Sequence, residues 1–246
     1  MSSWRHLPDA DAVRETAVAE ILQSADQAIT ARGRFRIVLA GGTTPRAIYR
    51  ELAARASGLS RWALYYGDER CLPTDHPERN SRMVEDSGLA ARAGAHHPIP
   101  AELGAEPAAA SYAGMIAPRL PFDLVLLGIG EDGHTASLFP GLPWPDEDAL
   151  VVPVHGAPKP PPERVSLAPR ALRACARMLV IATGDSKAAA LARWRAGETL
   201  PIQRVSEGLS HCLVLTDLPP MAFSSTGTNA TAPAPKPARP PDSSSG

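Results

Sequence analysis

The chain has 246 residues, of which 44% are hydrophobic and 21% charged, a composition typical of a soluble globular protein with a sizeable core. A formal net charge of -1 provides no basic field for nucleic acid or for an anionic membrane surface, so local groups must hold any anionic ligand. We therefore expect a small-molecule ligand, with no nucleic acid, no membrane and no obligate protein partner.

The N-terminal segment and the cysteines bear on the cellular compartment. Residues 1–20 lack the apolar region of a signal peptide, and no apolar run approaches the roughly 18 residues that a membrane helix needs. Cys71, Cys175 and Cys212 show no C-x-x-C spacing, so neither a disulfide framework nor a zinc site is indicated. We expect a cytoplasmic protein with reduced thiols.

Helices and apolar strands alternate along most of the chain. In chain order, we expect a helix over 9–32 that stops at Gly33, a strand over 35–40, a helix over 45–56 with Thr44 as its N-cap, a strand over 62–66, helices over 78–89 and 107–120, a strand over 122–128, a strand near 150, a strand over 177–183, a helix over 185–195 and a strand over 211–216. Apolar strands separated by helices predict an α/β fold, with an open, mostly parallel sheet covered on both faces in the Rossmann-like manner.

The composition changes after Pro220. Residues 221–246 are dominated by Pro, Ser, Ala and Thr, with Phe223 as the only aromatic residue. Such a segment cannot bury enough apolar area to offset its ordering entropy. We expect a single catalytic domain over 1–220 and a disordered tail over 221–246, with a docking role for the tail as the alternative.

Polar, turn-forming segments follow four of the expected strands. They are GGTTP (41–45), GDER (67–70), GIGEDGH (128–134) and TGDSK (183–187). In open α/β sheets, ligands bind beyond the carboxyl ends of the strands. We therefore expect these four segments to meet in one cleft.

The segment 128–133 has the Gly-x-Gly-x-x-Gly spacing of dinucleotide-binding proteins. That fold also requires a helix of several turns and a second strand, which Pro140, Pro143 and Pro145 leave no room to form. We therefore expect no nicotinamide or flavin cofactor. The glycines instead let the backbone approach a ligand and present the histidine that follows.

That histidine, His134, is the candidate general base. A neutral imidazole can take a proton from water and return it near neutral pH. Asp132 and Glu131 are both close enough in sequence to orient the ring. The alternative is that His134 only caps a short helix over the segment TASLF.

The GGTTP segment predicts an anion site, because backbone N–H groups and hydroxyls gather there at a helix N-terminus. No Gly-Lys-Ser/Thr follows, so one phosphate suits the loop better than a triphosphate; an ordinary turn with a Thr cap is the alternative. Lys187 lies in the first turn of its helix, which is unfavourable for a cation unless a ligand anion is shared. Arg46 and Arg164 are further candidate cations, and Arg46 is equally compatible with a solvated helix position. The loop residues are Gly41, Gly42, Thr43 and Thr44.

In the GDER segment, Arg70 is a candidate for stabilising an oxyanion, and Asp68 for holding a sugar hydroxyl or fixing Arg70. The alternative is a surface Asp–Arg pair that contributes little. Cys71 has no adjacent base and is expected to be a packing residue.

These motifs resemble those of the 6-phosphogluconolactonases, within the wider glucosamine-6-phosphate isomerase/deaminase-like group. The resemblance rests on GGTTPRAIYREL, YYGDERCLPTDHPERNSRM, FDLVLLGIGEDGHTASLFPG, PKPPPERVSL and TGDSKAAAL, in the order usual for the family. It implies a sugar-phosphate isomerase/deaminase type of fold. It also implies hydrolysis of 6-phospho-D-glucono-1,5-lactone to 6-phosphogluconate, in the oxidative pentose phosphate pathway, with no metal or cofactor.

By the same resemblance, His134 matches the family's catalytic histidine and Arg70 its DER arginine. Asp132 and Asp68 join them as candidate catalytic residues because of their places beside these two in the sequence. Phosphate binding falls on residues 41–44, on Lys187 and on Arg164. Absence of a G-x-S-x-G segment favours water activated by a histidine over a serine nucleophile.

Two other functions are alternatives to the lactonase. A glucosamine-6-phosphate deaminase or sugar-phosphate isomerase needs a carboxylate base, which Asp68 could supply, but the deaminases resemble DEY where this chain has DER. A non-catalytic sugar-phosphate sensor would be expected to lose His134 or Arg70, and both are present.

Overall fold

The structure is a computed structural model and describes residues 2–219. The expected tail over 221–246 lies outside the described residues. The strands are β1 (Ser3–His6), β2 (Phe35–Leu39), β3 (Trp62–Tyr66), β4 (Asp68–Arg70), β5 (Ala95–His96), β6 (Phe122–Gly128), β7 (Val151–Val154), β8 (Arg164–Leu167), β9 (Cys175–Ala182) and β10 (Cys212–Thr216). The α-helices are α1 (Ala10–Arg32), α2 (Thr43–Arg55), α3 (Asn80–Asp86), α4 (Leu89–Arg92), α5 (Ala105–Ile116), α6 (Pro169–Arg173), α7 (Ala188–Arg195) and α8 (Pro201–Ser206).

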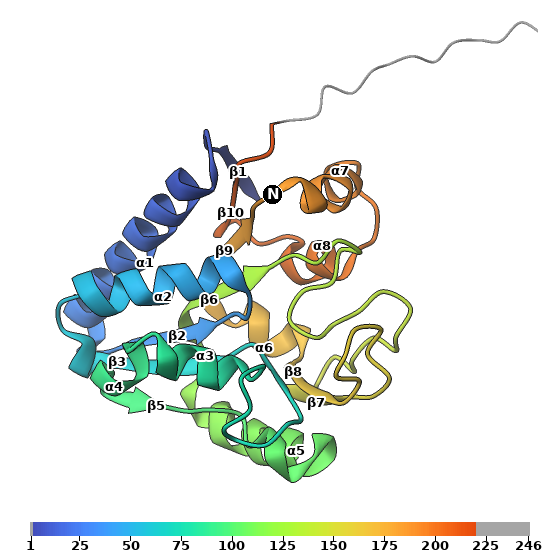
Figure 1. Ribbon diagram of the computed structural model, residues 1–246, viewed down its shortest axis with the longest axis horizontal. Coiled ribbons are helices and arrows are strands. Elements are labelled where there is room, and N and C mark those ends of the chain that lie inside the picture. Colours follow the sequence, from blue (N-terminus) through green and yellow to red (C-terminus); the bar gives the residue numbers. More distant parts are fainter. Residues whose placement is uncertain (1, 220–246) are drawn as a thin grey trace, which may run out of the picture.

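The main sheet has seven parallel strands in the order β1-β10-β9-β6-β2-β3-β5 (Figure 1). After β2, the strands β3 and β5 are added toward one edge of the sheet. After β6, the strands β9 and β10 are added toward the other edge. The strand order therefore reverses between β2 and β6. This is the point at which open α/β sheets bind their ligands.

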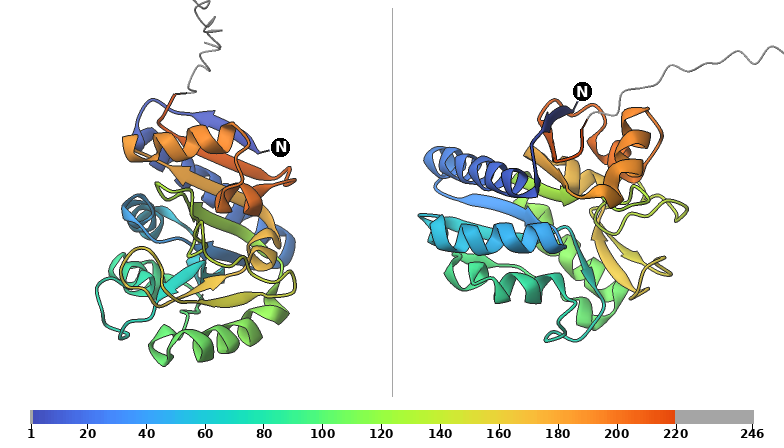
Figure 2. Two further views of the ribbon diagram at one scale, coloured as in Figure 1. Left: turned by 90° about the vertical axis from the view of Figure 1, so that its right-hand side faces the viewer. Right: turned by 45° about the horizontal axis from the view of Figure 1, so that its top comes forward.

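Helices lie on both sides of this sheet, as predicted. Helices α1 and α2 run side by side on one side, and α7 and α8 lie on the other (Figures 1 and 2). The inner strands β2, β3, β6 and β9 are buried on both faces, which explains their unbroken apolar runs. No helix within residues 2–219 is long and apolar enough to cross a bilayer.

A second, three-stranded antiparallel sheet with the order β4-β8-β7 was not predicted as such. The segment near 150 is a strand, but it belongs to this small sheet, against which α5 packs. The strands β4 and β8 are short and carry charged residues at buried positions, so they lack the alternation that marks a strand in a sequence. Their pairing places Arg70 opposite Arg164.

Several predicted boundaries differ from the structure for identifiable reasons. Helix α2 begins at Thr43, with Gly42 as N-cap at a φ of 116°, so Thr44 lies inside the helix and does not cap it. The expected helix over 78–89 is split into α3 and α4 by Gly88, whose φ is positive. The helix stop at Gly33 is confirmed: this residue adopts the left-handed conformation and donates its N–H to Ile29.

Candidate active site

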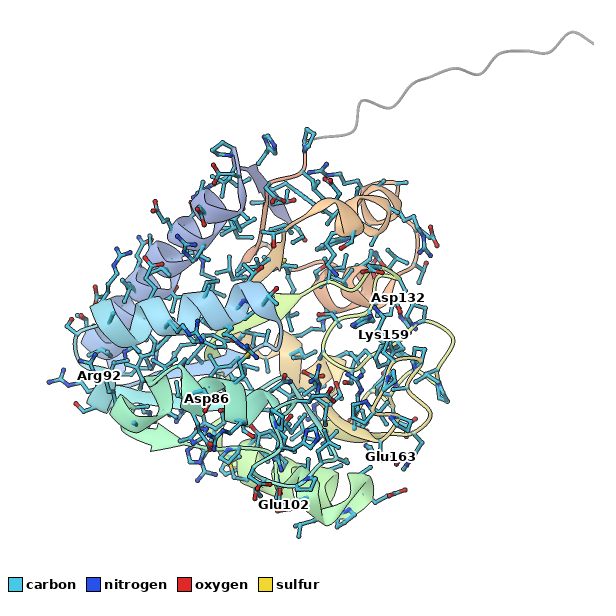
Figure 3. All side chains as sticks on the ribbon, viewed as in Figure 1. Asp86, Arg92, Glu102, Asp132, Lys159 and Glu163 are labelled. Atoms are coloured by element: carbon cyan, nitrogen blue, oxygen red, sulfur yellow. The ribbon has the colours of Figure 1, made fainter. Side chains whose placement is uncertain are left out.

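A cavity of about 500 Å³ lies at the carboxyl ends of β2, β6 and β9. Each of the four polar segments that follow the strands contributes to its wall, as the sequence predicts. A fifth segment, the loop between β7 and β8, forms one side of the cavity through Lys159 and Pro160. This loop is not among the four segments that the sequence predicts to meet there. The side chains on this part of the molecule are visible in Figure 3, where Asp132 and Lys159 mark it.

His134 lines this cavity and is held from behind by Asp132. The Nδ1 atom of His134 lies 2.5 Å from Oδ1 of Asp132, and the same oxygen accepts the backbone N–H of His134 at 3.1 Å. A carboxylate only accepts, so Nδ1 carries the proton and Nε2 keeps its lone pair. Glu131 is exposed and makes no hydrogen bond within residues 2–219, so Asp132 is the residue that orients the ring.

The backbone around His134 is shaped for this placement. A Cβ atom on Gly130 would lie 2.0 Å from Nδ1 of His134, so only glycine leaves room for the ring. The alternative, in which His134 caps a helix over TASLF, is wrong. Residues Thr135 and Leu138 form an isolated antiparallel bridge, and Ala136 between them has a φ of 48°, outside the right-handed helical region.

Two opposing effects set the charge state of His134. Burial lowers its pKa below the usual 6.5, and this effect outweighs the Asp132 and Asp68 carboxylates, which act to raise it; Lys159 lowers it further. Burial also acts to raise the pKa of Asp132, but the hydrogen bonds and charge of His134 lower it overall. The site therefore holds a neutral imidazole beside an ionised carboxylate at neutral pH, which is the state a general base requires.

The loop over residues 41–44 forms a second wall of the cavity. The buried hydroxyl of Tyr49 bonds both the N–H and the carbonyl of Ala40 at 2.8 Å, which fixes the entry to the loop. The hydroxyl of Thr44 lies 2.8 Å from that of Thr183, so the loops after β2 and β9 are joined across β6. This contact brings the N-terminus of α2 and the segment that carries Lys187 to one place.

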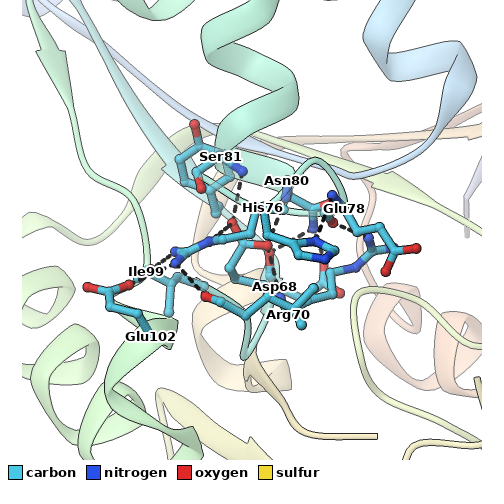
Figure 4. A network of polar contacts seen from close by, with 12 residues as sticks. Asp68, Arg70, His76, Glu78, Asn80, Ser81, Ile99 and Glu102 are labelled. Carbon is cyan, nitrogen blue, oxygen red and sulfur yellow. Dashed lines mark hydrogen bonds and ion pairs between the residues drawn. The ribbon is translucent and has the colours of Figure 1, made fainter. Parts of the chain in front are cut away.

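Asp68 lies in the floor of the cavity and is buried. Its Oδ2 accepts a hydrogen bond from Ser137 at 2.6 Å. Its Oδ1 accepts one from the amide of Asn80 at 3.1 Å, and these two residues are labelled in Figure 4. The hypothesis that Asp68 forms a surface pair with Arg70 is wrong, because Asp68 is 7% exposed and no ion pair joins the two residues within 2–219. Asp68 also does not fix Arg70, whose side chain donates to the carbonyl of Glu78.

A buried ion pair supports this floor from below. Glu69 is fully buried and accepts the N–H groups of Asn80 and Ser81 at 2.8 Å, so it caps the first turn of α3. Arg79, also buried, lies 3.3 Å from Glu69 and donates to Glu102 at 2.8 Å. The amide of Asn80 then packs against Gly41, where a Cβ atom would meet its oxygen at 2.3 Å. The network thus couples the floor to the loop over residues 41–44.

The lining of the cavity is strongly cationic. It contains Arg70, Lys159, Arg164 and Lys187 against the single carboxylate of Asp68, a surplus of three positive charges in a chain whose net charge is -1. None of the four cations forms an ion pair with a carboxylate of residues 2–219. Arg46, the other candidate cation, is exposed and does not line the cavity. The arrangement suits an anionic ligand.

Two residues of this lining were missed from the sequence. Lys159 belongs to the stretch PKPPPERVSL, where only Arg164 was singled out, although a lysine among prolines between two strands was a usable signal. The sequence gives no signal for Asn80, because this residue reaches Asp68 only where α3 begins beside β4. Cys71 is a packing residue as expected, and burial raises the pKa of its thiol to about 11. No cluster of metal-ligating side chains occurs in the described part of the chain.

Comparisons with known proteins show the family of this chain. The family model described as glucosamine-6-phosphate isomerases/6-phosphogluconolactonase matches residues 8–214. A 6-phosphogluconolactonase of Homo sapiens is 39% identical over 183 residues, which cover 66% of this chain and 69% of that protein. A 6-phosphogluconolactonase of Streptomyces coelicolor is 36% identical over 208 residues, with 75% and 79% covered. Among solved structures, the 6-phosphogluconolactonase of Thermotoga maritima superposes with a TM-score of 0.79 at 28% identity, covering 88% of this chain and 99% of that one.

Proposed function

The chain belongs to the glucosamine-6-phosphate isomerase/6-phosphogluconolactonase family, and from this premise we propose that it hydrolyses 6-phospho-D-glucono-1,5-lactone to 6-phospho-D-gluconate, a step of the oxidative pentose phosphate pathway. The observation that carries the proposal is the Asp132–His134 pair, which presents a neutral imidazole to a cavity with a surplus of positive charge. A phosphorylated lactone needs both features.

In this mechanism His134 is the general base. Its Nε2 takes a proton from a water molecule while the water oxygen forms a bond to the lactone carbonyl carbon. The Asp132 carboxylate holds the tautomer and stabilises the imidazolium that results. The scheme uses no cofactor or metal, since the imidazole of His134 activates the water.

The second half of the reaction returns the proton. The tetrahedral oxyanion collapses, the bond between the carbonyl carbon and the ring oxygen breaks, and the imidazolium gives its proton to the departing ring oxygen. The product is an open-chain acid that ionises in water. Arg70 is proposed to stabilise the oxyanion, because its guanidinium lines the cavity and its Nε is buried without a hydrogen-bond partner in the described residues. Asp68, fixed by Ser137 and Asn80, is proposed to orient a sugar hydroxyl.

The substrate phosphate is proposed to bind at residues 41–44, with Lys187 and Arg164 as cations. The free N–H groups at the N-terminus of α2 favour an anion there, and a phosphate at pH 7 carries a charge of about -1.5 to -2. Arg164 retains only its Nη1 for a ligand, because Nε and Nη2 donate to backbone carbonyls. Binding of the phosphate positions the lactone carbonyl at His134.

The alternative functions fit the site less well. A deaminase or isomerase needs a carboxylate that is free to take a proton from the sugar, and both oxygens of Asp68 are engaged with Ser137 and Asn80. A sensor without turnover has no use for the oriented imidazole.

The test is a rate measurement on 6-phosphogluconolactone generated in situ, compared with spontaneous hydrolysis in the same buffer. We expect a rate far above background and poor activity on gluconolactone without phosphate. A folded chain that leaves the background rate unchanged contradicts the proposal, and glucosamine 6-phosphate is then the next substrate to assay.

A further inference from the structure

The loop between β7 and β8 is held from beneath by one buried arginine. The Nε of Arg164 donates to the carbonyl of Pro161 at 3.0 Å, and its Nη2 donates to the carbonyls of Lys159 and Pro160 at 2.9 and 3.1 Å. Arg164 is 5% exposed, and its guanidinium also lies 5.5 Å from the ring centre of Phe139. One planar, rigid fork therefore fixes three consecutive carbonyls, which a lysine could not do.

The consequence falls on the side chain of Lys159. It lines the catalytic cavity and forms no ion pair or side-chain hydrogen bond within residues 2–219. Its charge acts on the ring of His134, alongside the Asp132 and Asp68 carboxylates that also face this ring. The geometry places its loop on the His134 side of the cavity: Arg164, which binds the carbonyl of Lys159, lies over Phe139, and the ring centre of Phe139 is 4.5 Å from that of His134.

We propose that Lys159 is a further catalytic residue, which binds the oxyanion that forms on the lactone carbonyl beside His134, and that Arg164 is the positioning residue that holds Lys159 in place. This inference rests on the proposed lactonase function and deepens it. It gives Arg164 a role in the chemical step in addition to any contact that its Nη1 makes with phosphate.

The placement of Lys159 decides between the two ends of the substrate. The carbonyl that is attacked must lie about 3–3.5 Å from the water that His134 deprotonates. The phosphate is at the opposite end of the sugar, on C6. Lys159 lines the cavity, and its loop is held on the side of Phe139 and His134, so we assign it to the carbonyl end. Negative charge develops there only during the reaction, so such a contact raises kcat more than it lowers KM.

Lys159→Met and Lys159→Arg test the catalytic role. With Lys159→Met we expect kcat to fall by about 10- to 100-fold with little change in KM, since one oxyanion donor is lost. The acid limb of the pH profile should move to higher pH, because a positive charge that disfavours protonation of His134 is gone. Lys159→Arg keeps the charge and should retain most of kcat and the wild-type limb. A raised KM with an unchanged kcat and pH limb would overturn the proposal.

Arg164→Lys and the double variant with Lys159→Met test the positioning role. Arg164→Lys keeps the charge but cannot bond three carbonyls, so we expect its kcat to fall about as far as that of Lys159→Met. The double variant should show little further loss in kcat, because both changes remove one contact. If the fold loss in kcat of the double variant equals the product of the two single losses, Arg164 does not act through Lys159.

Two controls keep the outcomes distinct. Thermal melts followed by circular dichroism report whether Arg164→Lys is folded at the assay temperature. Arg164→Gln, which retains amide donors for the carbonyls, is the second variant, and the same comparison with Lys159→Met applies to it. A wild-type chain without lactonase activity would defeat the proposed function itself, whereas an active wild type with an equally active Lys159→Met would defeat only this inference.

Discussion

The parallel sheet carries cavities of similar size at its two ends, and their charges differ. The cavity at the amino ends of β9 and β10 has a volume of about 600 Å³ and is lined by Arg5, Arg32 and Arg177, all three of which form ion pairs with Glu20 or Asp123. The cavity at the carboxyl ends, of about 500 Å³, has four cations that form no ion pair with any carboxylate in the described part of the chain. Volume alone therefore does not identify the site.

The difference has a physical cause. Charges of one sign repel each other, and this repulsion disfavours the folded state unless a counter-ion is present. At the amino ends the protein provides its own counter-ions. At the carboxyl ends a ligand anion can provide them, which supports the proposal that the substrate binds there.

The largest expected effect is on the base itself. His134→Ala should lower kcat by about 10²- to 10⁴-fold, since His134 is the one imidazole among the described residues that line the carboxyl-end cavity. The measurement is lactone loss against background, with circular dichroism to verify folding. His6→Ala, at an exposed position on β1, is the matched control. An active His134→Ala would show that the oriented imidazole is not the base.

Asp132→Asn should have the next largest effect, on the order of a 100-fold fall in kcat, because the amide no longer selects the tautomer or stabilises the imidazolium. The acid limb should also move to lower pH, since Asp132 raises the pKa of His134 against the effect of burial. Glu131→Gln changes the exposed neighbouring carboxylate and should retain activity. Equal losses in the two variants would contradict the assignment of Asp132.

The comparison between the two cavities is tested by one cation from each. Lys187→Met should raise KM for the phosphorylated lactone by about 10-fold or more, with a smaller effect on the lactone without phosphate. Arg177→Met, at the amino-end cavity, should leave kcat/KM unchanged and lower stability by about 1 kcal/mol or less, because Glu20 keeps Arg5 as a partner. If Arg177→Met raised KM as Lys187→Met does, the two cavities would not differ in function.

The smallest expected effect concerns stability against pH. Because burial lowers the pKa of His134 in the folded state, its contribution to stability is present above pH 6.5 and is lost as pH falls through the lowered folded pKa. The free energy of unfolding should therefore fall more in wild type than in His134→Gln between pH 7.5 and pH 5. Denaturant unfolding of both proteins at the two pH values measures this difference. A loss equal in the two proteins would mean that the imidazole titrates normally.

Prediction from the sequence succeeded where the signal is local and long. The strand over 62–66 agrees with β3, and the expected strand over 122–128 with β6, because buried strands of a parallel sheet are continuous apolar runs. The prediction of one cleft also holds, since parallel strands place their carboxyl ends at one edge. The prediction of Thr44 as the N-cap was wrong, because α2 begins one residue earlier, at Thr43. The hydroxyl of Thr44 instead bonds that of Thr183, which is far away in the sequence.

The sequence by itself determined the α/β class, the four polar segments and the histidine that follows the glycines, because each depends on residues adjacent in the chain. Only the tertiary structure decided that Asp132 rather than Glu131 holds His134, that Asp68 is a buried acceptor, and that Arg164 fixes the loop of Lys159. The direction and burial of a side chain arise when distant segments pack. In particular, β4 and β8 are nearly a hundred residues apart in the sequence, and their pairing brings the positive charges of Arg70 and Arg164 together at the site.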